Sequence, residues 1–182
     1  MINNSYLAYL LHASGKVTRL PPASAVIGKS AIVTPLAINK YDEVVGWWGP
    51  DDYPNPFLWA NHQLYSLGPL GQATAINNLG VVVGYASYNP PYTGSCDFQV
   101  IGYCRAFIWE ENSSGYWMAA DLNTLLSPSD PLYSNATMVE ATSINDVGQI
   151  LVIAIYTQGP KQNQVTTLIL NPVVTNAAVA AR

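Results

Sequence analysis

The chain has 182 residues and a formal net charge of −4, and 49% of its residues are hydrophobic while only 10% are charged. Seven Lys and Arg residues provide no basic stripe of the kind that a nucleic-acid surface needs, and no apolar run reaches the length of a membrane span. The 13 Gly and 13 Pro residues are typical of a chain with many tight turns. The composition predicts neither a nucleic-acid partner nor a membrane span.

The first predicted elements are two short strands, at 6–11 and 16–20. Residues 36–48, LAINKYDEVVGWW, then predict a β-hairpin, because two runs too short for ordinary helices flank a turn. The pattern returns in ATAINNLGVVVGYAS at 73–87 and in TSINDVGQILVIA at 142–154. A hairpin that recurs is evidence for a repeat architecture.

The three hairpins share their turn chemistry. An Asn opens each four-residue turn, and its side-chain oxygen is expected to bond the backbone ahead. The fourth position needs positive φ, which Gly tolerates best and Asp tolerates better than most residues. The predicted caps are Asn39, Asn77 and Asn145, and the predicted fourth-position residues are Asp42, Gly80 and Gly148.

Two further strands follow each of the first two hairpins, and one follows the third. One recurs as PFLW at 56–59, AFIW at 106–109 and, more loosely, TLIL at 167–170, and a short strand at 63–67 or 117–122 comes after the first two. With the hairpin strands called a and b, each unit reads a-b-c-d with a period of about forty to fifty residues, which is typical of a β-propeller blade. A β-sandwich or β-prism is the alternative, although neither has a reason to repeat its turn chemistry.

The repeats predict an all-β fold of four-stranded antiparallel, propeller-like units in a single domain at 1–172. About three blades are present, and the ring is left incomplete or is completed by oligomerisation, because a closed propeller needs at least four. The units are expected at about 1–30 (partial), 31–72, 73–139 and 140–172 (partial), followed by a loose tail at 173–182.

The segment AINNLGVVVGY followed by AFIW, and NPFLW followed by LYSLGPLGQATAIN, resemble the HAF family of extracellular repeats. Members of that family recur as Ile-Asn-x-x-Gly-x-Val-Val-Gly, then Ala-Phe-x-Trp, then Leu-Gly-x-Leu-Gly-Gly. The resemblance covers most of residues 31–125, and more loosely the first strand pair and 140–172. Departures are Asp42 and Val152 in place of Gly and Pro56 in place of Ala. The resemblance implies a secreted or cell-surface protein with propeller-like blades, and it implies no reaction.

Cys96 and Cys104 lie in one polar insertion that is rich in Pro and Gly. A hairpin-like excursion would bring the two sulfurs within disulfide range, and closing so small a loop contributes about 2–3 kcal/mol in the chain-entropy description. Two unrelated buried thiols are the alternative, which the polar surroundings disfavour. A zinc site would lack half its ligands, so we expect no metal and no cofactor.

The predicted binding surface is the rim opposite the a–b turns. The long irregular connections at 21–30, 49–55, 88–104, 127–140 and 157–164 all fall there, as in repeat scaffolds that carry binding loops on a rigid support. Asp51 and Asp52 offer a calcium-ligand pair, although a solvated acidic turn explains them more simply. The candidate binding residues are Trp48, Asp51, Asp52, Tyr53, Tyr88, Tyr92, Phe98 and Tyr103.

The recurring aromatic residues, Phe57, Trp59, Phe107 and Trp109, are assigned to packing between blades. His12 and His62 fall in turns with no partner specified. We expect no two carboxylates to face one cavity at glycosidase spacing.

The predicted function is a non-enzymatic extracellular or cell-surface module. It binds a protein or glycan ligand, or it self-assembles into an oligomer or fibre by strand-edge complementation. The alternative is a hydrolase or lyase that acts on an extracellular carbohydrate.

Overall fold

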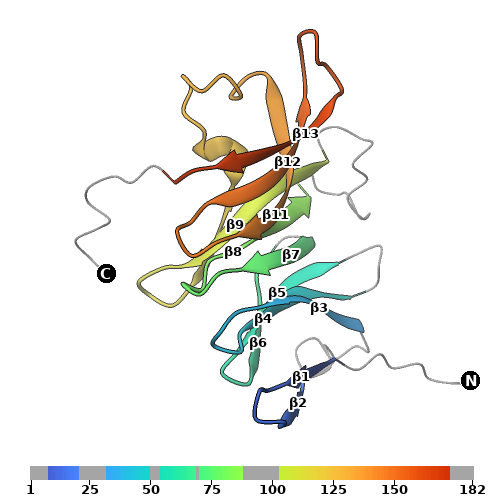
Figure 1. The fold of residues 1–182 in the computed structure, drawn as a ribbon, viewed down its shortest axis with the longest axis vertical. Helices are drawn as coiled ribbons and strands as arrows, with labels where there is room; N and C mark the ends of the chain where they lie inside the picture. The colour runs from blue at the N-terminus through green and yellow to red at the C-terminus, as the bar shows by residue number, and fades with distance from the viewer. Residues whose placement is uncertain (1–7, 21–31, 50–53, 69, 88–102, 173–182) are drawn as a thin grey trace, which may run out of the picture.

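The computed structural model describes residues 8–20, 32–49, 54–68, 70–87 and 103–172. These residues form four antiparallel sheets that follow one another along the long axis of the molecule (Figure 1). The first sheet has two strands, the second and third have four each, and the fourth has three. The predicted all-β chain of antiparallel sheets is therefore confirmed. The described sheets form an open stack, and no closed ring is found among them.

Each sheet is a meander in which strands adjacent in sequence are adjacent in space. The strands of the first two sheets are β1 (Tyr9–Leu11) and β2 (Val17–Arg19), then β3 (Ile32–Ile38), β4 (Val44–Gly49), β5 (Asn55–Ala60) and β6 (Gln63–Ser66). The third sheet contains β7 (Gly71–Ile76), β8 (Val82–Ser87), β9 (Cys104–Glu111) and β10 (Trp117–Asp121), and the fourth contains β11 (Ala136–Ile144), β12 (Ile150–Tyr156) and β13 (Val165–Leu170).

These strands correspond to the strand types a to d of the repeat. Strand a is β3, β7 or β11, and in all three it shifts register against strand b at the equivalent place, for example between Ala73 and Ala75. Such a shift marks a β-bulge, which bends and twists the strand locally. Two strands begin before the predicted unit borders, because β7 starts at Gly71 and β11 at Ala136.

One short helix was not predicted. The 3₁₀ helix η1 (Leu122–Leu125) links β10 to the connection that leads to β11. The Asp121 carboxylate caps it by accepting a 2.8 Å hydrogen bond from the Asn123 backbone N–H. None of the helical segments in the described ranges has the length and apolar character that a membrane crossing requires.

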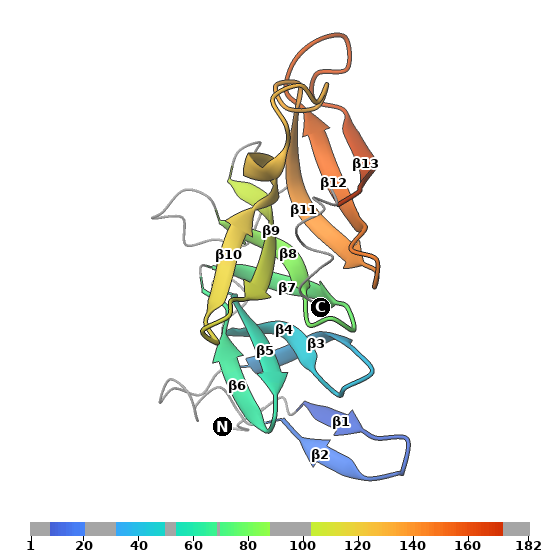
Figure 2. The same ribbon diagram turned by 90° about the vertical axis from the view of Figure 1, so that its left-hand side faces the viewer.

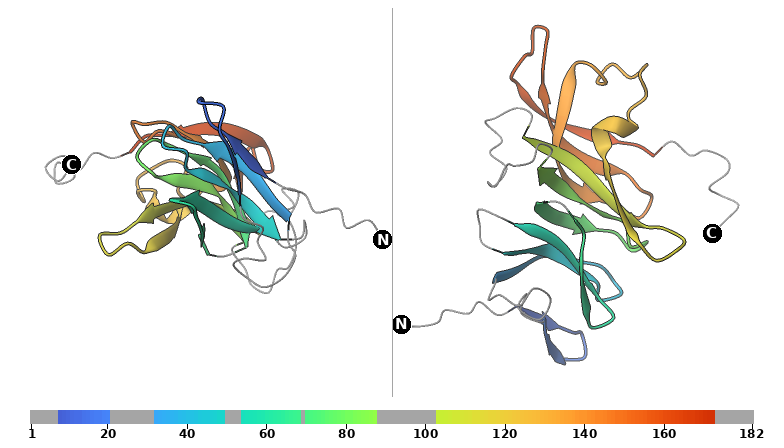
Figure 3. Two further views of the ribbon diagram at one scale, coloured as in Figure 1. Left: turned by 90° about the horizontal axis from the view of Figure 1, so that it is seen from below. Right: turned by 180° about the vertical axis from the view of Figure 1, so that it is seen from behind.

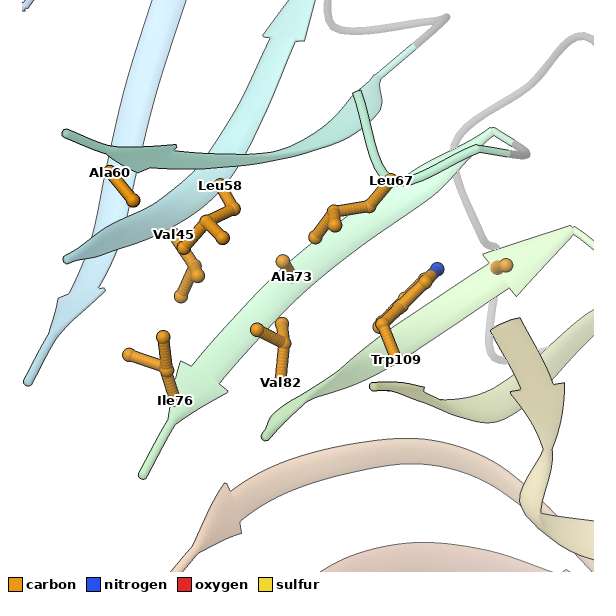
Figure 4. Packing of buried hydrophobic residues seen from close by; sticks show 9 residues of the cluster. Val45, Leu58, Ala60, Leu67, Ala73, Ile76, Val82 and Trp109 are labelled. Atoms are coloured by element: carbon orange, nitrogen blue, oxygen red, sulfur yellow. The ribbon is translucent and has the colours of Figure 1, made fainter. Parts of the chain in front are cut away.

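The sheets pack face to face, and a separate apolar cluster fills each of the three interfaces. The central cluster joins Val45 and Leu58 of the second sheet to Ala73, Val82 and Trp109 of the third (Figure 4). Figure 2 shows the same four-layer order from the side, and Figure 3 shows it along the stack and from behind. Each inner sheet therefore buries both faces, one against the sheet before it and one against the sheet after it.

Candidate functional site

The three a–b turns lie on one rim, at the left of Figure 1. In the third sheet the Asn77 Oδ1 accepts backbone hydrogen bonds from Leu79, at 3.0 Å, and from Val81, at 2.9 Å. Asn39 and Asn145 make the same pair of bonds two and four residues ahead in their own turns. The fourth turn position has φ of 63° at Asp42, 80° at Gly80 and 82° at Gly148. Each predicted cap thus occupies an equivalent position in its sheet.

The turns also bond to one another across the sheet interfaces. The Asn39 Nδ2 donates to the Asn77 carbonyl oxygen at 3.0 Å, and the Asn77 Nδ2 donates to the Asn145 carbonyl oxygen at 3.1 Å. A side chain that closes its own turn through its oxygen therefore links the next turn through its nitrogen. We call this series of three turns the asparagine ladder.

The following residue of each turn adds a parallel set of links. The Lys40 N–H donates to the Asn78 Oδ1 at 2.9 Å, and the Asn78 N–H donates to the Asp146 Oδ1 at 2.8 Å. The Asn78 Nδ2 donates to the other Asp146 oxygen at 2.7 Å. These hydrogen bonds, the side-chain bond first, hold the pKa of Asp146 below its usual value. The rim is therefore a hydrogen-bonded surface that spans three sheets.

Replacing Asn77 with Ala is expected to lower the free energy of unfolding by about 2 kcal/mol, since about 1 kcal/mol comes from the lost cap and about 1 from the lost inter-sheet bond. Asn112 is the matched control, because its Oδ1 caps the β9–β10 turn with the same two backbone bonds but joins no other sheet in the described structure. Asn112→Ala should lower the free energy by about 1 kcal/mol. Urea denaturation followed by circular dichroism measures both, and equal losses would contradict a stabilising role for the ladder.

A cleft of about 420 Å³ opens beside the ladder, between the second and third sheets. The β3–β4 turn contributes Tyr41 and Glu43, and the ends of β9 and β10 contribute Glu110, Glu111 and Trp117. The remaining lining comes from the β7–β8 turn, residues 78–81. We call this the acidic cleft.

The lining of the acidic cleft includes three Glu residues and two aromatic residues, and none of the described Lys or Arg residues. The Glu43 carboxylate accepts a hydrogen bond from the Asn39 Nδ2, so the ladder holds one of the three acids in place. Glu111 and Trp117 lie directly opposite each other in the β9–β10 register, which puts their side chains on the same face. The Lys40 ammonium lies 4.9 Å from the centre of the Tyr41 ring, so that ring already contacts a cation.

This cleft is not among the sites that the sequence predicts. The predicted binding surface is the opposite rim, whereas this cleft lies beside the a–b turns and is lined in part by Glu43, Glu110 and Glu111. The expectation that no two carboxylates face one cavity at glycosidase spacing stays a prediction. These Glu residues form no recognisable sequence motif. Glu110 and Glu111 are the two exposed residues at the end of β9. The signal that was available is the proximity of the a–b and c–d turns, which the strand order puts on the same rim.

The residues predicted to bind a ligand fall mostly outside the described ranges. Trp48 lies on β4, half-buried against the cluster between the first and second sheets, and Tyr103 is half-buried just before β9. Of the long connections predicted on the opposite rim, those at 127–140 and 157–164 are described in full, and the second lies across the fourth sheet from the β11–β12 turn (Figure 1). The predicted residues outside the described structure are Asp51, Asp52, Tyr53, Tyr88, Tyr92 and Phe98.

The predicted disulfide is described at one end only. Cys104 is 3% exposed at the start of β9, and Cys96 lies outside the described residues. The pairing stays a prediction. Among the described residues no group of three His, Cys, Asp or Glu side chains lies as a metal site would require.

The two histidines have partners that the sequence did not specify. The His12 Nδ1 lies 2.9 Å from the Asp42 Oδ2, and its Nε2 lies 2.8 Å from the Thr18 hydroxyl. These contacts join the β1–β2 turn to the first turn of the ladder. His62 packs edge-on against the Trp59 ring, with the ring centres 5.8 Å apart. Both histidines therefore have structural roles.

One half-buried acid, Glu140, lies away from the cleft. Burial raises the pKa of Glu140, on β11. Burial, and then the Glu140 charge, also raise the pKa of the Tyr85 hydroxyl on β8. The pair lies at the interface of the third and fourth sheets, where a charged carboxylate is unfavourable.

The fold and the rim define an antiparallel β-repeat protein whose turns are stacked into one continuous surface. The chain belongs to the family described as protein of unknown function (DUF3466), which matches residues 22–180. Comparison with the curated proteins and with the solved structures finds no match.

Proposed function

We propose that the chain is a non-enzymatic, extracellular or cell-surface β-repeat module that binds a cationic group of a protein or glycan partner in the acidic cleft. The observation that carries this proposal is a cavity whose described lining includes three Glu residues and two aromatic residues, with Lys40 in contact with the Tyr41 ring as the nearest example of a bound cation. Carboxylates attract an ammonium or guanidinium group, and the faces of Trp and Tyr rings add cation–π attraction. The cleft is an open site on a rigid rim, as binding sites on repeat scaffolds commonly are.

The extracellular setting rests on two further features. The turn and strand motifs resemble the HAF repeats, and the predicted Cys96–Cys104 disulfide would persist only in an oxidising compartment. We also propose that the blades are propeller-like, because two complete a-b-c-d meanders occur in succession. Both statements apply to the whole protein and are proposals.

Binding is tested with a pentalysine peptide and the same peptide acetylated on its side chains, by isothermal titration calorimetry. The cationic peptide is expected to bind, and the acetylated peptide to bind at least tenfold more weakly, because acetylation removes each positive charge. Glu110→Gln with Glu111→Gln should weaken binding of the cationic peptide by about fivefold, since each exposed ion pair contributes about 0.5 kcal/mol.

The matched control is Asp130→Asn, which removes a negative charge outside the cleft, in the connection between η1 and β11. It should leave the affinity unchanged. If Asp130→Asn weakened binding as much as the double variant, the attraction would be due to net charge alone and the cleft would have no part in it. Raising the salt concentration should weaken the cationic complex, because exposed charges are screened.

A second candidate function uses the same cleft. The alternative is a hydrolase or lyase that acts on an extracellular carbohydrate. A glycoside hydrolase uses two carboxyl groups about 5–9.5 Å apart, and three Glu residues line this cavity. Release of reducing ends from a glycan mixture by the wild type, and its loss in the Glu110→Gln/Glu111→Gln variant, would favour the enzyme over the binding module.

Self-assembly is the other part of the proposed function. The fourth sheet has three described strands, and β13 lies at its edge with only β12 as a described neighbour. An edge of this kind is a template for another strand. Strand-edge complementation between copies would build an oligomer or fibre.

A further inference from the structure

The outer face of the fourth sheet carries exposed apolar side chains, with the exposed Thr167 of β13 and Ser143 of β11 among them. Ile169 of β13 is 62% exposed, Val165 is 67% exposed, and Leu151 of β12 is 37% exposed. These three side chains and Ile153 lie on the same face, because they alternate with the residues that pack against the third sheet. Neither β12 nor β13 contains a charged residue. A face of this kind is an interaction surface.

The equivalent faces of the two preceding sheets are covered. Strand b starts opposite the Ile that precedes each ladder Asn, so Val45, Val83 and Leu151 occupy one position of the repeat. Val45 and Val83 are 0% exposed, because each packs against the next sheet. The side chains opposite them in strand c are Leu58, which is 2% exposed, and Ile108, which packs against the third interface cluster. At the positions of Leu151 and Ile169, the fourth sheet thus repeats a face that a further sheet covers twice within the chain.

The other end of the stack shows the complementary face. The β1–β2 hairpin has the same turn bonding as the β9–β10 hairpin, which makes Tyr9 equivalent to Trp109. Trp109 is 0% exposed against the second sheet, whereas Tyr9 is 55% exposed. Leu11 and Val17 are paired on the same outer face and are 69% and 58% exposed, and the exposed Arg19 lies opposite Tyr9 on that face. Inside the molecule, the Trp109 face of the third sheet packs against the Val45 face of the second sheet. Tyr9 is equivalent to Trp109 and Leu151 is equivalent to Val45, so the two end faces correspond to the two sides of that interface.

We propose that copies of this chain stack head to tail, with the Leu151–Ile169 face of one copy covering the Tyr9–Val17 face of the next. The inference rests on the proposed self-association and assigns it to the faces of the end sheets. The strand edge of β13 is the other surface that could join copies, and the test distinguishes the two. A second copy is the occupant that fits, because one chain carries both halves of the interface that joins its own sheets. Two different surfaces meet in such a contact, so the association is heterologous and continues into a filament or a ring.

The test uses two variants at exposed positions, Ile169→Lys and Tyr9→Lys, each of which adds a charge to one end face. Sedimentation velocity from about 1 µM to about 1 mM is expected to show wild-type assemblies that grow with concentration, and monomers for each variant alone. Circular dichroism confirms that each variant is folded.

Mixing the variants gives the decisive result. Ile169→Lys keeps an intact Tyr9 face and Tyr9→Lys keeps an intact Leu151–Ile169 face, so an equimolar mixture should form a 1:1 dimer and grow no further. If both variants formed assemblies as large as those of the wild type, the face contact would be contradicted, and self-association through the strand edges would remain as the explanation. Loss of assembly in Ile169→Lys alone would show a symmetric contact and overturn the head-to-tail arrangement. A wild type that stays monomeric would remove self-association as well.

Discussion

Replacing Gly84 with Ala is expected to lower the free energy of unfolding by at least about 3 kcal/mol, which is at the upper end of the usual cost of overpacking. A Cβ at this position of β8 would lie 2.0 Å from the Gln72 carbonyl oxygen and 3.0 Å from its carbon. Both are backbone atoms of β7, so no flexible side chain can move aside. In the second sheet, a Cβ added at Gly46 would lie at the same 2.0 Å from the Thr34 carbonyl oxygen. Gly46→Ala is therefore expected to give the same result.

Guanidinium denaturation followed by circular dichroism measures the effect. Gly80→Ala is the control, because it strains the backbone without a steric clash. Gly80 has φ of 80° and no atom within 4 Å of its ideal Cβ position. Ala at that position suffers only the left-handed backbone, which costs about 1–2 kcal/mol. If the Gly84 variant lost no more stability than the Gly80 variant, the close approach of β7 and β8 would not require glycine.

The sequence predicted the glycines of the turns but not this role of Gly84. A turn glycine is recognised from its neighbours, since an Asn three residues earlier sets the turn. The close approach at Gly84 depends on the register shift in β7, which pairing between strands creates and local sequence does not specify. Local sequence also does not explain Val152, which occupies the position of this glycine in β12. The facing strand β11 has a second register shift there, between Met138 and Glu140.

The strand order could be predicted because the a-b-c-d repeat encodes it, and neighbouring strands pair with each other. The asparagine ladder could not, because its bonds join residues 38 and 68 positions apart. The repeat shows that three turns are alike, but only the stacking of the sheets shows that each Asn nitrogen reaches the next turn. The acidic cleft was missed for the same reason, since its lining comes from two different sheets.

Trp109→Ala is expected to lower the free energy of unfolding by about 3–5 kcal/mol, the usual cost of removing a fully buried Trp. The Trp109 side chain is 0% exposed and lies in the cluster between the second and third sheets, beside Val82 and Ala73 (Figure 4). Its loss would leave a cavity lined by two sheets that pack rigidly, so little of the space can collapse. The indole N–H has no hydrogen-bond partner within the described structure, so the loss is one of packing alone.

Tyr9→Ala is the matched control, because Tyr9 occupies the same position in the β1–β2 hairpin and is 55% exposed. In dilute solution its cost should stay within about 0.5 kcal/mol, as for other exposed positions. Urea denaturation at one low protein concentration compares the two, since any stacking of copies that involves Tyr9 is then absent. If Tyr9→Ala lowered the free energy of unfolding as much as Trp109→Ala, the outer face of the first sheet would already be covered within its own chain. Stacking of copies through that face would then be contradicted.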